Sequence, residues 1–180
     1  IGQSVLWNTF INNSVKLNHL MNADSLHGVL KRYSLPKRDY LWTTFINGVT
    51  LDDNRIIQLI KVYNKGEMFE ISDKEQIRLL LILFSWVLTS SNRWLRDTTS
   101  KAMIEILKDY FEYNQYLLEL FSEINDPYVI QRLYGIVFGA CMKRKLENKK
   151  IYKSLVIFIF DDIFNKQIVY PDILLRDYAR

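Results

Sequence analysis

The clearest pattern in the chain is an apolar stripe at helical spacing that begins near residue 77. Its members fall at i, i+3, i+4, i+7, i+10 and i+11, and they are Ile77, Leu80, Leu81, Phe84, Val87 and Leu88. Side chains at these intervals lie on one side of an α-helix. Asp73 and Glu75 stand near the start, where acidic side chains interact favourably with the helix dipole. The stripe therefore predicts a helix that is opened by Asp73.

The same pattern repeats after a polar break at 89–92, which ends in Asn92, a good N-cap residue. The next apolar stripe consists of Leu95, Thr99, Ala102, Met103, Ile106, Leu107 and Tyr110. A helix is then predicted over about 114–124. The tripeptide at 125–127 breaks and restarts the chain, with a proline that a first helical turn tolerates. The following helix presents Val129, Leu133, Ile136, Val137 and Ala140.

The apolar run at 155–160 could form a strand when it is read alone. Helical spacing, however, extends over three turns through Tyr152, Leu155, Val156, Ile159, Phe160 and Ile163. Asp161 and Asp162 continue the segment without a turn signal, so a helix is the better prediction. We expect these two carboxylates to lie on its solvent side, because adjacent helical residues point about 100° apart and do not converge on one atom.

The first 70 residues are less regular, with four helices predicted near 4–22, 25–33, 36–48 and 52–63. Lys65-Gly66 resembles a helix end, and Asp52-Asp53 a helix start. Only six glycines and three prolines punctuate the chain, and no linker marks a domain boundary. We therefore expect one all-α domain of about ten helices over 1–180. Its first part, 1–70, is expected to be irregular, and 73–180 to form helical pairs.

A weak internal repeat supports these pairs. Leu95-Arg96-Asp97 and Leu175-Arg176-Asp177 share three residues, and Val129 occupies the equivalent place after a break of its own. Leu95 and Val129 are 34 residues apart, and Val129 and Leu175 are 46 apart. The offset of 46 lies within the period of about 40–47 residues that is typical of paired-helix repeats, and the offset of 34 lies below it. Such pairs stack because one pair cannot bury both of its apolar faces.

These residues resemble the second helix of HEAT repeats. The family's arginine is matched by Arg96 and Arg176, and its aliphatic position by Leu95, Val129 and Leu175. Its packing position is matched by Thr99, Leu133 and Ala179, whereas Ile130 stands where arginine is expected. The resemblance implies an α-α superhelix, that is, a HEAT/ARM-like solenoid. It makes Arg96, Asp97, Arg176 and Asp177 structural repeat positions, with both aspartates expected in first helical turns.

A narrower resemblance concerns 92–102 and 173–180, which look like stretches in the C-terminal helical regions of bacterial antiviral STAND (NACHT-type) ATPases. In that family an effector and an NTPase precede a helical array that senses a phage protein. The chain contains no phosphate-loop motif, so the resemblance implies a piece of the sensor array only. The non-methionine start at Ile1 and a repeat that stops at Arg180 lead us to expect a fragment of a larger protein.

Composition restricts the cellular compartment and the kinds of partner that we expect for this chain. A single cysteine, Cys141, excludes an internal disulfide and favours the reducing cytoplasm. The longest apolar run, 79–88, is about half the length that a bilayer requires, so no membrane partner is expected. The net charge of +4 permits an anionic partner without requiring one.

Candidate catalytic groups are few. His19 and His27 lack the partners of a metal site, and Cys141 has no histidine at the spacing of a nucleophilic motif. Gly135 and Gly139 share a helical face, where they suit close packing better than phosphate binding. We therefore predict a chain that is not an enzyme and takes no cofactor, metal or small-molecule substrate.

One basic cluster is a candidate binding site for an anionic partner, and it comprises Lys143, Arg144, Lys145, Lys149, Lys150 and Lys153. In sequence it is opposed only by Glu147. The alternative is a solvated loop. A smaller basic group surrounds Pro36 and comprises Lys31, Arg32, Lys37 and Arg38.

Two functions compete on these observations. The leading hypothesis is a non-catalytic protein-binding or sensor array, in bacterial antiphage defence if the narrower resemblance holds. The alternative is a nucleic-acid-binding α-solenoid that uses the basic cluster. A helical-repeat enzyme comes third, because it would need a pocket that the sequence does not reveal.

Overall fold

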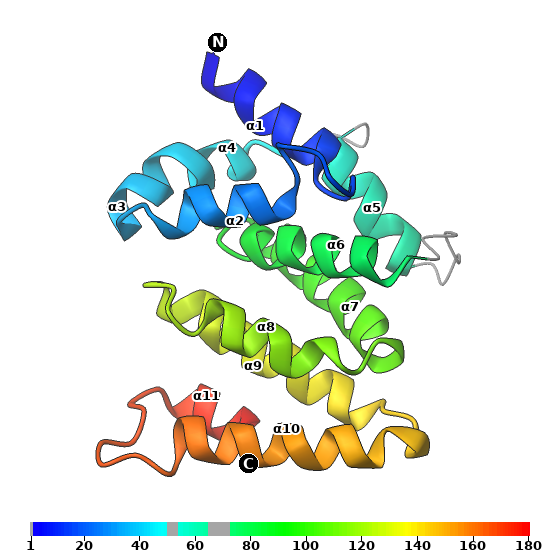
Figure 1. Ribbon diagram of the computed structural model, residues 1–180. Helices are drawn as coiled ribbons and strands as arrows, with labels where there is room; N and C mark the ends of the chain where they lie inside the picture. The colour runs from blue at the N-terminus through cyan, green and yellow to red at the C-terminus, as the bar shows by residue number, and fades with distance from the viewer. Residues whose placement is uncertain (1, 50–53, 65–72) are drawn as a thin grey trace. The chain divides into compact units, whose positions relative to one another are not determined.

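The computed structural model describes residues 2–49, 54–64 and 73–180, and these are helical with no strand among them (Figure 1). Eleven α-helical segments, one π-helical turn and one 3-10 turn make up this part of the chain. The all-α prediction is thereby confirmed. The chain divides into two compact units, 1–103 and 104–180, and the division falls inside helix α7 (Arg93–Asp109). The expectation of one domain over the whole chain stays a prediction.

Unit 1 contains α1 (Gly2–Asn13), α2 (Ala23–Lys31), α3 (Leu35–Arg38), α4 (Thr44–Asn47), α5 (Arg55–Asn64), α6 (Lys74–Val87) and the first part of α7. The helix predicted over 4–22 ends at Asn13, and turns follow. The Asn13 amide donates to the Thr9 carbonyl and the Ser14 hydroxyl donates to the Ile11 carbonyl, so side chains occupy acceptors of the last turn. Such competition for backbone partners is typical of helix ends. Asp52-Asp53 and Lys65-Gly66 lie outside the described residues.

The predicted helix over 36–48 forms, but not as one regular α-helix. A π-helical turn, Asp39–Thr43, joins α3 to α4. Within it the indole of Trp42 is fully buried and its Nε1 donates to the carbonyl of Trp86 at 3.0 Å. Trp7 of α1 packs edge-on against Trp42, with ring centroids 5.5 Å apart. The irregular turn thus places a large aromatic side chain at the centre of unit 1.

Helix α6 forms the core of unit 1, and the sequence predicted its opening correctly. The Asp73 carboxylate caps it by accepting from the Glu75 amide at 2.9 Å. Burial extends beyond the predicted stripe, because every residue from 79 to 88 is buried. A helix that is apolar all round is buried on every side. In Figure 1 the neighbouring α2 runs beside α6, and the Arg78 guanidinium joins the Asp24 carboxylate at 2.7 Å.

Unit 2 contains the rest of α7, α8 (Tyr113–Phe121), α9 (Pro127–Met142), a 3-10 turn (Leu146–Asn148), α10 (Lys149–Ile163) and α11 (Ile173–Tyr178). Helix α9 packs against α8 and α11, and α10 packs against α8 (Figure 1). The run at 155–160 lies inside α10, which confirms the prediction of a helix. None of the described helices combines the length and apolar character that crossing a bilayer requires.

Three helices begin in the same way. The aliphatic residues Leu95, Val129 and Leu175 are each the third residue of their helix, α7, α9 or α11, and each is fully buried. In each case the side-chain oxygen of the N-cap residue accepts from the amide of that aliphatic residue, at 3.3 Å from Asn92, 3.2 Å from Asp126 and 3.0 Å from Asp172. The three positions that were aligned in sequence therefore also share the same hydrogen-bond geometry at the helix start.

Gly135 and Gly139 of α9 allow close packing, and the neighbouring atoms that approach them belong to side chains and not to the backbone of another helix. A Cβ at Gly139 would lie 2.7 Å from Ile104 Cδ1, and one at Gly135 would lie 3.1 Å from the Tyr178 ring. Both distances are shorter than ordinary van der Waals contact. The absence of a side chain at these positions lets α9 meet its neighbours in unit 2.

Candidate functional site

Some members of the basic cluster between α9 and α10 pair with carboxylates in the fold, and others do not. Lys143 pairs with Glu105, and Lys145 pairs with Asp109 at 2.8 Å. Both carboxylates come from the second half of α7. The hydrogen bonds from Lys108 and Lys143 hold the pKa of Glu105 below its usual value. The sequence expectation that only Glu147 opposes the cluster is therefore wrong. The two carboxylates of α7 are far from this loop in sequence, and only the fold brings them close to it.

Arg144 has a structural role in the same loop. Its guanidinium donates to the carbonyl of Cys141 at 2.8 Å and lies 3.9 Å from the centroid of the Tyr152 ring. A cation at the C-terminal end of a helix binds carbonyls that have no partner within the helix. Arg144 thus joins the end of α9 to α10, and its charge is already engaged.

Lys149, Lys150 and Lys153 are exposed like the other members of the cluster, but they differ from them in pairing. No hydrogen bond or ion pair connects their ammonium groups to any residue that the structure describes. Lys149 and Lys150 open α10, which has no acidic residue in its first turn. Positive charge at a helix N-terminus is unfavourable by a few tenths of a kcal/mol to about 1 kcal/mol. These lysines are therefore the part of the cluster that is available to a partner.

The adjoining outer face of α10 is apolar, and the sequence did not reveal this. The predicted stripe included Val156 and Phe160, but these side chains are 45% and 55% exposed. The residues that α10 buries are Leu155, Ile159 and Ile163, spaced four apart. Such a narrow buried stripe indicates that α10 is covered along one line only. Ile157, at 53% exposure, completes the uncovered face.

Helix α11 adds to the exposed apolar surface of unit 2. Ile173 and Leu174 are 66% and 54% exposed, while the next residue, Leu175, is fully buried. The smaller basic group in unit 1 is a weaker candidate for binding a partner, because Arg38 is buried with its guanidinium 5.4 Å from the Trp86 ring. The strongest candidate binding surface is therefore the outer face of α10.

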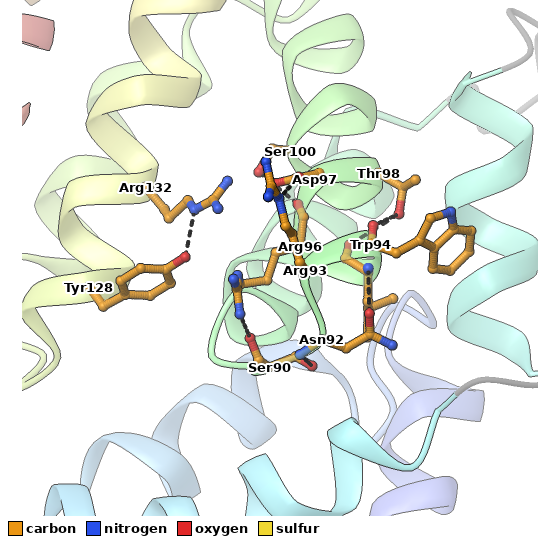
Figure 2. A network of polar contacts seen from close by, with 11 residues as sticks. Ser90, Asn92, Arg93, Trp94, Arg96, Asp97, Thr98, Ser100, Tyr128 and Arg132 are labelled. Atoms are coloured by element: carbon orange, nitrogen blue, oxygen red, sulfur yellow. Dashed lines mark hydrogen bonds and ion pairs between the residues drawn. The ribbon is translucent and has the colours of Figure 1, made fainter.

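Two of the four predicted repeat positions, Arg96 and Asp97, contact residues that are close to them in the chain. Figure 2 shows the Arg96 guanidinium donating to the carbonyl of Ser90 at 2.7 Å, which supports the turn before α7. Asp97 pairs with Arg93 of the same helix at 3.4 Å. In α11 the side chain of Arg176 is half-buried, Asp177 is exposed, and neither side chain forms a hydrogen bond or ion pair with another described residue.

The expectation that both aspartates lie in first helical turns is wrong. Asp97 is the fifth residue of α7 and Asp177 the fifth of α11, and neither helix has an acidic residue in its first turn. The N-cap roles belong instead to Asn92 and Asp172. The common Leu-Arg-Asp motif begins at the third helical residue, which the sequence alone did not place.

The nucleophilic and imidazole groups are held by packing. His27 is buried against Trp86, with ring centroids 5.6 Å apart, and burial lowers its pKa to about 4. Burial raises the pKa of the Cys141 thiol to about 11, so the thiol is protonated at neutral pH. His19 Nδ1 accepts from the backbone amide of Met21 at 3.0 Å. No group of three metal-ligating side chains occurs within 2–49, 54–64 and 73–180.

A small hollow in unit 2 contains the most perturbed polar pair. It has a volume of about 90 Å³ and lies between α8, α9 and α10. On its wall the Tyr134 hydroxyl donates to Asp162 at 2.6 Å, and Lys166 pairs with the same carboxylate at 2.7 Å. The expectation that Asp162 lies on the solvent side is therefore wrong, although it holds for the exposed Asp161. Pockets for small metabolites usually measure roughly 300–1,000 Å³, so this hollow suits water better than a substrate.

The chain matches no known family model, no curated protein and no solved structure. The outer face of α10 and the exposed lysines at its N-terminal end are therefore the features on which a functional proposal rests.

Proposed function

We propose that this chain is a non-catalytic protein-binding helical array whose binding surface is the outer face of α10. The observation that carries the proposal is the exposure of Ile157 and Phe160 in the middle of a regular helix. Contiguous exposed apolar side chains with a charged rim are typical of protein interaction sites. A partner protein would remove this surface from water.

The arrangement that we propose for the array is a HEAT/ARM-like solenoid. Its support is the common start of α7, α9 and α11, in which an Asn or Asp cap binds the amide of a buried aliphatic residue. A helix pair in a stack must bury an apolar face against each neighbour. The uncovered face of α10 is what such a pair presents when no neighbour covers it.

The biological setting that we propose is sensing in bacterial antiphage defence, in the cytoplasm. Its support is the resemblance of 92–102 and 173–180 to the helical sensor regions of antiviral STAND ATPases, together with a surface suited to a protein ligand.

Site-specific photo-crosslinking in cells tests the protein-binding proposal. A photoreactive phenylalanine analogue at position 160 should form adducts with protein, which mass spectrometry would identify. The matched control is the same analogue at Tyr40, an aromatic residue of unit 1 that is 75% exposed. Adducts at both positions to the same extent, or none at position 160, would contradict the proposal.

A second candidate function is nucleic-acid binding, and the three exposed lysines of α10 favour it. Three phosphate contacts would give a slope of log affinity against log salt of about −2 to −3. Lys150→Glu should then weaken binding to a DNA or RNA duplex much more than Lys101→Glu, which alters an exposed lysine of α7. The absence of binding at low salt would exclude this function.

A further inference from the structure

One face of α10 carries charge of opposite sign at its two ends. The residues on this face fall at spacings of three and four, and they are Lys150, Lys153, Ser154, Ile157, Phe160, Asp161 and the C-cap residue Phe164. At about 100° per residue, all of them lie within about 60° of the direction of Ile157. Of the seven, only Phe164 is half-buried, and its ring lies 6.2 Å from that of Phe160. The face therefore reads basic, apolar, acidic from its N-terminal to its C-terminal end.

This order of charges is unfavourable within α10 itself. Lysines stand at the end where the helix dipole is positive, and Asp161 stands near the end where it is negative. The Asp161 carboxylate accepts a hydrogen bond from the Asn165 amide at 3.0 Å, which leaves its charge uncompensated. A partner that stabilises this face must present an acidic group beside Lys153 and a basic group beside Asp161. It must also present an apolar surface between them.

We infer that this partner is a second copy of the chain, bound through α10 in an antiparallel helix pair around a two-fold axis at Ile157. The inference rests on the proposed function of this face as a protein-binding surface and names its occupant. Lys153 and Asp161 each lie four residues from Ile157. An antiparallel pair centred on Ile157 therefore brings Lys153 of each copy to the level of Asp161 of the other. Both ion pairs form together, as a self-complementary two-fold interface requires.

The apolar residues complete the match. Ile157 lies on the axis and meets its own counterpart, and Phe160 of each copy packs beside it. A nucleic acid fits less well, because Ile157, Phe160 and Asp161 share the face with the lysines. Helix α10 has 15 residues, so the pair alone forms a small interface. Small interfaces are typical of weak, reversible association, and we expect a Kd on the order of micromolar.

Sedimentation equilibrium of the 180-residue chain at about 1 to 200 µM tests this inference, because that range brackets the expected micromolar Kd. Lys153→Asp replaces two attractive pairs per dimer with two repulsive ones, as does Asp161→Lys. Each should raise the Kd by about tenfold or more, whereas the double variant inverts both pairs and should return it to within about threefold of the original. Lys101→Asp, on an exposed site of α7, should leave the Kd unchanged. All substitutions lie on exposed sites, and circular dichroism would verify that the fold is retained.

Two results would overturn the inference. One is a chain that stays monomeric at the highest concentration, and the other is a double variant as weak as the single ones. Crosslinking from position 160 separates this failure from failure of the proposed function. Adducts to a different protein would support the protein-binding surface and contradict a second copy of the chain as its occupant. The absence of any protein adduct would contradict both proposals.

Discussion

The hydroxyl of Tyr134 on α9 donates a hydrogen bond of 2.6 Å to the carboxylate of Asp162 on α10. Tyr134 is 2% exposed, and burial followed by the bond to Asp162 raises its pKa well above the usual value. Asp162 also accepts from Lys166 one helical turn later, at 2.7 Å. This contact joins α9 and α10 through two residues that lie 28 positions apart in the chain. It helps to set which face of α10 is turned toward its neighbours.

Removal of the Tyr134 hydroxyl tests the strength of this contact. Hydrogen bonds to charged groups contribute about 1.5–3 kcal/mol, but Lys166 still pairs with Asp162 after Tyr134→Phe. We expect the variant to lower the free energy of unfolding by about 1–2 kcal/mol, measured by urea denaturation. Tyr128→Phe is the control, because the Tyr128 hydroxyl accepts from Arg132 on an exposed surface and should change stability by less than about 0.5 kcal/mol.

A methyl group at Gly139 should destabilise unit 2. The new Cβ would lie 2.7 Å from Cδ1 and 3.1 Å from Cγ1 of Ile104, so Ile104 must move. Overpacking costs about 1–3 kcal/mol, and the better helix propensity of alanine offsets about 1 kcal/mol of it. We expect Gly139→Ala to lower the free energy of unfolding by about 1 kcal/mol on balance.

Gly28→Ala is the matched control, because a Cβ at this helical glycine of α2 meets nothing within 4 Å. It should raise the free energy of unfolding by about 0.5–1 kcal/mol. Equal effects of the two substitutions would show that the contact with Ile104 does not restrict position 139.

Protonation of His27 should destabilise the fold at acid pH. Burial, with a smaller contribution from Lys31, lowers its pKa from about 6.5 to about 4, while Asp24 acts in the opposite direction. Between these values the unfolded chain binds more protons at this site than the folded chain. Stability therefore falls as the pH drops from about 6.5 toward 4. We expect this site to remove about 2 kcal/mol between pH 7 and pH 5.

The measurement is the free energy of unfolding against pH for the original chain, for His27→Gln and for His19→Gln. His27→Gln should lose this component of the pH dependence, and His19→Gln should retain it. If the three curves run parallel between pH 5 and pH 7, the imidazole of His27 is not kept neutral by burial.

Loss of the Asp172 side chain should release α11 locally. Its carboxylate caps the helix through the Leu175 amide at 3.0 Å and accepts from the Gln131 amide of α9 at 2.7 Å. N-cap removal typically costs about 1 kcal/mol, and the bond to Gln131 is lost with it. We expect Asp172→Ala to increase hydrogen exchange at the amides of 175–179 by about tenfold.

Asp177→Ala provides the comparison, since Asp177 is exposed and its side chain forms no hydrogen bond or ion pair with a described residue. It should leave the exchange rates in α11 nearly unchanged. Similar exchange in both variants would indicate that the Asp172 side chain contributes little to holding α11 in place.

Much of the fold followed from local chemistry that sequence expresses directly. The apolar spacing predicted α6, α7, α8, α9 and α10, and the helix starts at Asp73 and Asn92 were recognisable because a helix N-terminus needs a side-chain acceptor close in sequence. Helix ends inside polar stretches were predicted less well. The segment after Asn13 leaves the helix because nearby side chains compete for its backbone groups, a balance that periodicity does not register.

The sequence by itself determined that the chain is helical, where most of its helices begin and which residues carry charge. Only the tertiary structure decided which of those groups meet a partner. Lys143 and Lys145 are paired because α7 returns two carboxylates to their loop, whereas Lys153 has no such neighbour among the described residues. Phe160 and Ile159 are equally apolar in sequence, yet only Ile159 is covered. Helical spacing states that side chains share a face, but the neighbour that covers a face comes from distant parts of the chain.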